Sequence, residues 1–89
     1  MDANLTVEMR KKRIKIRAWR RGTKEMDLSL GSFVDSSLSS LGEKELAVIE
    51  ALIDEEDEDI YSWIMERTNS PKEYSSILNV LRSQEYYFG

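Results

Sequence analysis

A glycine set among charged residues is the feature of this sequence best suited to recognising another molecule. It lies in residues 20–25, which read Arg-Arg-Gly-Thr-Lys-Glu. Gly22 has no Cβ, so a partner can approach its backbone closely. The Arg21 guanidinium can make a two-pronged bond to a partner carboxylate or carbonyl, and Glu25 can accept a hydrogen bond in return. This pattern indicates a surface that binds a protein.

A purely structural interpretation of the same residues is also available. Gly22 would be the left-handed residue that follows a helix, with Arg20 and Arg21 at the negative end of the helix dipole. Arg21 and Glu25 would then face each other across the turn, in a pair worth only a few tenths of a kcal/mol if exposed. Trp19 is expected at the surface, where tryptophan is enriched in interface hot spots.

An acidic run at residues 54–59 invites comparison with a calcium site. It lacks the glycine at the sixth loop position and the distal glutamate that an EF-hand needs. Acidic residues are also favoured at the positive N-terminal end of a helix. We therefore interpret the run as the start of a helix and expect no metal site.

The sequence contains neither cysteine nor histidine. Their absence removes thiol nucleophiles, disulfides, imidazole acid-base chemistry and the usual zinc ligands. A chain of 89 residues also has little room for a desolvated pocket that would tune its remaining carboxylates, hydroxyls, lysines and tyrosines. We expect no enzymatic activity, no catalytic residue and no cofactor bound by this chain.

Charge is divided along the chain. Residues 1–25 hold nine basic and three acidic side chains, a net charge of +6, and the remainder carries −10. The cations at residues 10–13, Lys15 and Arg17 occupy early and middle turns of an expected helix, where they repel one another and oppose the dipole. They form either a solvated face or a site for an anionic partner.

Three kinds of anionic partner fit such a basic helix. A nucleic acid is one alternative, although the acidic remainder would repel phosphates and no known nucleic-acid reader is present. The acidic end of a second copy is another. We expect a protein partner, no nucleic acid, and a monomer when the chain is free.

Apolar residues at three- and four-residue spacings predict an all-α fold, a compact five-helix bundle that forms a single domain over residues 1–89. The first helix is expected over residues 6–21, with Ile14, Ala18 and Trp19 as its apolar contacts. The second is expected over residues 24–40. Gly31 inside it indicates that a neighbouring helix packs closely there.

Capping signals place two further helices. The third is capped at either Ser40 or Gly42 and carries its apolar residues through Ile53. The fourth is expected to begin near Asp57 and to end near Asn69. Tyr61 and Trp63 are expected in the core and at its rim, with Trp63 as the main buried residue of the fourth helix.

The strongest local signal opens the fifth helix. Residues 70–73, Ser-Pro-Lys-Glu, combine an N-cap hydroxyl, a proline at the first helical position and a glutamate that completes a capping box. The tail at residues 84–89 is expected to be flexible. No apolar run approaches the ~18 residues of a membrane span, so we expect no membrane association.

Taken in order, these features resemble the SdhE/Sdh5 family, the assembly factors for the flavoprotein subunit of succinate dehydrogenase. The resemblance rests on Arg21-Gly22-x-x-Glu25, the RGxxE motif, followed by Asp27 and an apolar helix with Phe33. Residues 46–53, an acidic turn and a Tyr-x-Trp segment then follow in the family's order. The similarity covers about residues 16–81, and the motif itself is intact.

The resemblance implies a five-helix domain that binds the flavoprotein subunit and promotes covalent attachment of FAD to a histidine of that subunit. It implies that Arg21, Gly22, Glu25 and the nearby Asp27 lie on the contact surface. The FAD would belong to the partner. We add three residues of the basic first helix and its end to the expected partner-binding set, namely Arg17, Trp19 and Arg20.

The family also bears on clients and compartment. It leaves open whether the fumarate reductase flavoprotein is a second client. Members occur in bacterial cytoplasm and in the mitochondrial matrix. Asp2, Glu8 and the short lead before the domain argue against a transit peptide, so we expect a bacterial cytoplasmic protein.

Overall fold

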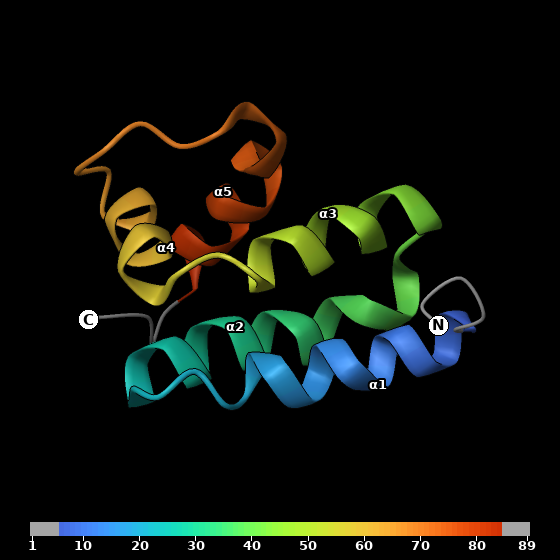
Figure 1. The fold of residues 1–89 in the computed structure, drawn as a ribbon. Helices are drawn as coiled ribbons and strands as arrows, with labels where there is room; N and C mark the ends of the chain where they lie inside the picture. Colours follow the sequence, from blue (N-terminus) through green and yellow to red (C-terminus); the bar gives the residue numbers. More distant parts are fainter. Residues whose placement is uncertain (1–5, 85–89) are drawn as a thin grey trace.

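Five α-helices form the fold of the computed structural model, which describes residues 6–84 (Figure 1). Within that part of the chain there is no strand, so the predicted all-α class is confirmed. Two short 3-10 turns, η2 and η3, precede α3 and α5. The elements are α1 (Val7–Ala18), α2 (Lys24–Ser37), η2 (Leu38–Ser40), α3 (Glu43–Ile53), α4 (Asp57–Ile64), η3 (Lys72–Tyr74) and α5 (Ser75–Ser83).

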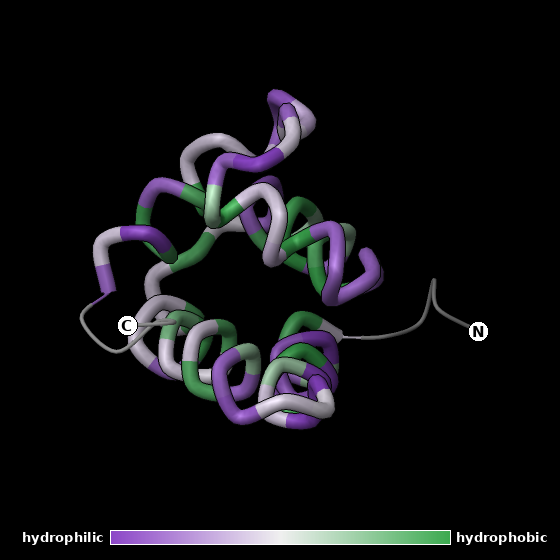
Figure 2. The backbone as a smooth tube through the Cα atoms, turned by 90° about the vertical axis from the view of Figure 1, so that its left-hand side faces the viewer, coloured by the Kyte–Doolittle hydropathy of each residue, from purple (hydrophilic) through white to green (hydrophobic). Residues whose placement is uncertain are grey.

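The helices pack around one core. α1 and α2 lie side by side and antiparallel, α3 packs on α1, and α5 contacts both α4 and α2 (Figure 1). Hydrophobic and hydrophilic segments alternate along the helices, as expected when each helix buries one face (Figure 2). The core side chains include Ile14, Ala18, Met26, Leu30, Phe33, Val34, Leu46, Ile49, Leu52, Ile53, Ile60, Trp63, Ile64, Tyr74, Leu78 and Leu81.

The first helix is shorter than its sequence pattern suggested. Thr6 caps it, because its Oγ1 accepts a hydrogen bond from the Met9 N–H at 3.1 Å. The helix ends at Ala18, before the expected end at Arg21, and Trp19 is its C-cap. Gly22 has the expected positive φ, +106°. It does not directly follow the helix, however, because it lies further along the α1–α2 turn (residues 19–23).

Contacts with α2 account for this early end. The indole of Trp19 lies against Gly31, so that a Cβ at Gly31 would clash with its ring atoms Cδ2 and Cε2. Trp19 Nε1 also donates to Asp35 Oδ2 at 3.2 Å. Trp19 is therefore half-buried, which agrees with its expected place among the apolar contacts of the first helix and not with the alternative of a surface position. The close packing of a neighbouring helix predicted at Gly31 is found, and it is made by this ring at the end of α1.

The second helix begins where expected. Thr23 caps it, with its Oγ1 accepting from the Met26 N–H at 3.2 Å. The final turn of the expected helix, residues 38–40, is the 3-10 turn η2. Of the two caps considered for the third helix, Gly42 is the one found.

The fourth and fifth helices depart from their sequence signals. α4 begins at Asp57 as expected but ends at Ile64, well before Asn69, and the chain reverses at Glu66 with φ of 58°. Arg82 of α5 reaches back to this end, where it donates to the carbonyls of Trp63 at 2.7 Å and Ile64 at 3.1 Å. These bonds satisfy carbonyls that a helix end leaves unpaired.

Pro71 is the N-cap of η3, and α5 itself begins only at Ser75. The expected capping box is not formed, since no side chain caps either element. Tyr74 explains the shift: it is buried, its ring lies 5.7 Å from that of Trp63, and its hydroxyl donates to Glu55 Oε2 at 2.8 Å. These tertiary contacts determine where the chain enters α5.

Two further expectations concern the C-terminal tail and membrane-spanning helices. The flexible tail was expected over residues 84–89, of which 85–89 lie outside the described residues. Gln84 is described, and its Nε2 donates to the Ser29 carbonyl at 3.0 Å. The helices found between residues 6 and 84 are all too short or too polar to cross a membrane.

Candidate functional site

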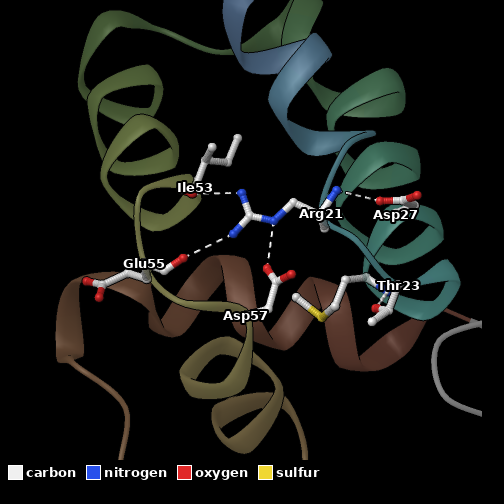
Figure 3. Close-up of polar contacts among 7 residues, drawn as sticks. Arg21, Thr23, Asp27, Ile53, Glu55 and Asp57 are labelled. Atoms are coloured by element: carbon white, nitrogen blue, oxygen red, sulfur yellow. Dashed lines mark hydrogen bonds and ion pairs between the residues drawn. The ribbon is translucent and has the colours of Figure 1, made fainter.

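Arg21 stands at the centre of the candidate site, where the α1–α2 turn meets the α3–α4 turn (residues 54–56). Its side chain is only 8% exposed. Nη1 donates to the Ile53 carbonyl at 2.7 Å, Nη2 to the Glu55 carbonyl at 3.0 Å and Nε to Asp57 Oδ1 at 2.8 Å (Figure 3). The guanidinium therefore points inward and binds three groups: the last residue of α3, the α3–α4 turn and the first residue of α4.

The backbone of Arg21 is also held. Its N–H donates to Asp27 Oδ1 at 2.6 Å, so the carboxylate of α2 fixes the α1–α2 turn (Figure 3). Asp27 is half-buried, in keeping with this structural role. Arg21 thus joins the α1–α2 turn to the C-terminal end of α3, whose last carbonyls have no partner within their own helix.

The expected contact between Arg21 and Glu25 is not formed. Glu25 is exposed in the first turn of α2, and no hydrogen bond or ion pair within residues 6–84 connects it to Arg21. The two charged residues of the motif therefore face different surroundings: Arg21 faces the protein and Glu25 faces outward. The Arg21 side chain is engaged within the chain and 8% exposed, and its place in the partner-binding set stays a prediction.

Gly22 is the outermost point of the turn. It is exposed, and a Cβ built on it would meet nothing within 4 Å. Arg20, on its N-terminal side, is exposed as well. Arg20, Gly22 and Glu25 are therefore exposed along the α1–α2 turn and the start of α2, whereas the Arg21 side chain is buried and Asp27 is half-buried.

A shallow hollow lies beside this surface, with a volume of about 250 Å³. One side is formed by Arg17, Arg20 and Arg21, and the other by residues 53–57. Arg17 Nη1 forms an ion pair with Asp54 Oδ1 across it. The hollow is thus lined by opposite charges, of which Arg17 pairs with Asp54 and Arg21 pairs with Asp57.

The acidic run is the part of the site that sequence reasoning missed. It does begin α4 as expected, but Asp54 and Asp57 also bind Arg17 and Arg21. Within residues 6–84, no group of three or more acidic side chains is arranged to hold a metal ion. The opposite net charges of the two parts of the chain hinted at such pairing, but sequence spacing cannot identify the partners.

Glu55 connects the α3–α4 turn to η3. Its carbonyl accepts from Arg21, and its carboxylate accepts from the Tyr74 hydroxyl. Burial, with a further contribution from this hydrogen bond, raises the pKa of Tyr74 to about 12. The α3–α4 turn is therefore held from both sides, by Arg21 and by Tyr74.

Several cations of α1 are paired within the chain. Arg10 donates to Glu50 through Nε at 3.0 Å and through Nη2 at 2.6 Å, and the hydrogen bond raises the pKa of Arg10. Lys15 Nζ lies 3.8 Å from Asp35 Oδ1. Together with the Arg17 pair, these bonds reduce the positive charge that nucleic-acid phosphates would meet.

Comparison with known proteins gives a consistent set of matches. Residues 12–85 match the model of the Sdh5 family, described as the flavinator of succinate dehydrogenase. A similar protein is succinate dehydrogenase assembly factor 2, mitochondrial, of Dictyostelium discoideum, 31% identical over 70 residues, which cover 79% of this chain and 50% of that protein.

Two other relatives match at the same level. The FAD assembly factor SdhE of Acetobacter pasteurianus is 33% identical over 64 residues, covering 72% of this chain and 59% of the relative. Assembly factor 2-A of Drosophila willistoni is 33% identical over 82 residues, covering 89% and 52%. The chain thus spans between half and three fifths of the length of these relatives.

Proposed function

The chain belongs to the Sdh5 family of succinate dehydrogenase flavinators, and on that basis we propose that it is an assembly factor for that enzyme. In this proposal it binds the flavoprotein subunit and promotes the covalent attachment of FAD to it. The chain has no turnover of its own. A flavoprotein of the fumarate reductase type is a further candidate client.

The observation that carries the proposal is the outward surface of the α1–α2 turn. Arg20, Gly22 and Glu25 are exposed there, and the space over Gly22 is open. A glycine at the outermost point lets a partner's backbone approach closely. Arg20 and Glu25 supply one donor and one acceptor group on either side, which favours recognition of a polar protein surface.

We assign a different role to Arg21, Asp27 and Trp19. Each of them binds another part of the chain, so they position the surface and do not contact the partner. Arg17 lies at the edge, exposed but paired with Asp54. A turn held by buried hydrogen bonds loses little conformational freedom when it binds, which favours affinity.

The chain would accelerate the covalent attachment of FAD by aligning the flavin with the histidine that receives it. The sequence has no histidine, so the histidine that receives the flavin has to belong to the flavoprotein. The chain would hold that subunit in the conformation in which flavin and histidine are adjacent. Correct positioning of reacting groups is worth up to about 7–11 kcal/mol of an activation barrier.

The residues of the site do not fit FAD itself. The hollow beside the turn, about 250 Å³, is smaller than the roughly 300–1,000 Å³ of pockets that hold drug-sized ligands. Two of its three arginines are already paired with aspartates of the hollow, Arg17 with Asp54 and Arg21 with Asp57. The proposal therefore leaves FAD with the flavoprotein and gives this chain a docking role.

Substitution of Gly22 tests the proposal. We call Arg20, Gly22 and Glu25 the docking surface. Gly22→Arg places a long side chain on this surface. We expect it to weaken binding to the flavoprotein at least about thirty-fold, equivalent to about 2 kcal/mol. The subunit coexpressed with this variant should carry little covalent FAD. Affinity is measured by titration, and attachment by flavin fluorescence of the denatured subunit on a gel.

Gly22→Ala is the matched control. Both variants put an L-residue at φ of +106°, at a cost to folding of about 1–3 kcal/mol, but only arginine adds bulk. Gly22→Ala should therefore bind much better than Gly22→Arg, with similar helix content by circular dichroism. Equal, tight binding of Gly22→Arg and wild type would rule out the assigned surface.

A further inference from the structure

The outer face of α1 exposes two large apolar side chains. Met9 is 51% exposed and Ile16 is 54% exposed. Both lie on the side of the helix opposite to Ile14 and Ala18, which are buried against the rest of the domain. The apolar contacts of α1 within the domain therefore involve other residues, and these two are left to solvent.

Cations accompany the two apolar residues. At about 100° per residue, Met9, Lys12 and Ile16 fall within a band of about 60° on the helix surface. Arg20 follows four residues later, just beyond the helix end. We call Met9, Lys12, Ile16 and Arg20 the outer α1 stripe. Lys12 and Arg20 are exposed, and within residues 6–84 neither forms an ion pair.

The stripe is continuous with the docking surface, because Arg20 belongs to both. We propose that the outer α1 stripe is a second part of the surface that binds the flavoprotein subunit, and that it contacts an acidic, partly apolar area of that subunit. This inference rests on the proposed function. It enlarges the contact from one turn to the length of α1.

The charges of the outer α1 stripe favour the flavoprotein subunit over a second copy of the chain as its binding partner. A symmetric dimer formed through the stripe would place the same cations of both copies against each other, which is unfavourable. The acidic groups that face α1 within the domain, such as Glu50 and Asp54, are already paired with its other cations. Methionine and arginine are also enriched in protein interfaces.

Ile16→Glu tests the inference, because it places an acid in the middle of the stripe without touching the core. We expect binding to the flavoprotein to weaken at least about tenfold, as for an interface residue of moderate energy. Lys12→Glu, which leaves both apolar residues in place, should weaken binding in the same direction. Covalent FAD on the coexpressed subunit should fall in parallel.

Val80→Glu is the matched control. Val80 is an aliphatic residue on another helix, α5, and is 45% exposed. The substitution changes the net charge by the same amount as Ile16→Glu, and we expect affinity equal to that of wild type. Circular dichroism should show the same helix content in all three variants.

The outcomes separate this inference from the proposed function. If Gly22→Arg loses binding while Ile16→Glu and Lys12→Glu bind as Val80→Glu does, the stripe is not part of the interface and the inference is wrong. If wild type does not bind the flavoprotein, the proposed function fails and the inference fails with it. A dimer in sedimentation that Ile16→Glu dissociates would assign the stripe to a second copy and overturn the inference.

Discussion

At the scale of single residues, Arg21 shows how a charged side chain within a proposed recognition motif can serve the fold. Its guanidinium donates to two backbone carbonyls and one carboxylate of the opposite turn. A planar group with several donors in fixed directions suits this arrangement, whereas an ammonium group offers a single point of charge. Arginine is therefore required by the geometry of the turn as well as by its charge.

Arg21→Lys should destabilise the domain. Lysine cannot reach the Ile53 and Glu55 carbonyls and Asp57 together, so at least one of these groups loses its bond. We expect the free energy of unfolding to fall by about 2–3 kcal/mol, measured by urea denaturation followed by circular dichroism.

Arg20→Lys provides the control for this measurement. The Arg20 side chain is exposed and forms no hydrogen bond or ion pair within residues 6–84, so its replacement should change the stability by less than about 0.5 kcal/mol. Equal stability of Arg21→Lys and Arg20→Lys would show that the inward bonds of Arg21 contribute nothing to the fold.

At the scale of elements, the packing of α1 on α2 depends on a glycine. Gly31 lies inside α2, where alanine would favour the helix by about 1 kcal/mol. The Trp19 ring occupies the space that a Cβ would need. The residue that weakens α2 locally therefore allows the end of α1 to dock against it.

A double-mutant cycle of Gly31→Ala and Trp19→Ala tests this coupling. In the wild-type background, Gly31→Ala should displace the ring and destabilise the domain. In the Trp19→Ala background the clash is absent, and the same change should stabilise by up to about 1 kcal/mol through helix propensity. Urea denaturation gives the four free energies of unfolding, and additive effects would contradict the packing described.

At the scale of the whole molecule, the α3–α4 turn links the two parts of the bundle. Arg21 binds it from the α1–α2 side, and Tyr74 binds it from the side of η3 and α5. The proposed docking surface is therefore supported by contacts that begin at Tyr74 in η3. Ion pairs between the basic α1 and acidic residues of α2, α3 and the α3–α4 turn add to this support.

The Tyr74 hydroxyl predicts how stability depends on pH. Its pKa is about 12 in the folded protein, above the ordinary value of 10.0, so the folded state holds this proton more tightly. Its contribution to stability is complete below pH 10 and is lost as the pH rises from about 10 to 12. The free energy of unfolding should decrease across this window.

Tyr74→Phe removes the titrating group while keeping the ring. This variant should be less stable than wild type at neutral pH, because Glu55 loses its donor, and should lose less stability between pH 10 and 12. Tyr61→Phe removes a phenol from α4 instead of η3 and controls for the general effect of alkaline pH. An alkaline decrease as steep in Tyr74→Phe as in wild type would exclude this role for the phenol.

The sequence by itself determined the features that depend on neighbouring residues. Periodic apolar residues predicted the all-α class and the position of α3, because both depend on spacing along the chain. The acidic residues also predicted the start of α4 at Asp57. The motif was also evident, since Gly22 and Glu25 are defined by type and spacing.

The tertiary structure decided where the local signals compete with contacts between distant segments. The end of α1, the start of α5 and the direction of Arg21 depend on Trp19 against Gly31, Tyr74 against Glu55 and Arg21 against Asp57. Each of these pairs joins residues that are far apart in sequence. Helix-capping preferences of about 1 kcal/mol are comparable to single tertiary contacts, so packing determines the outcome.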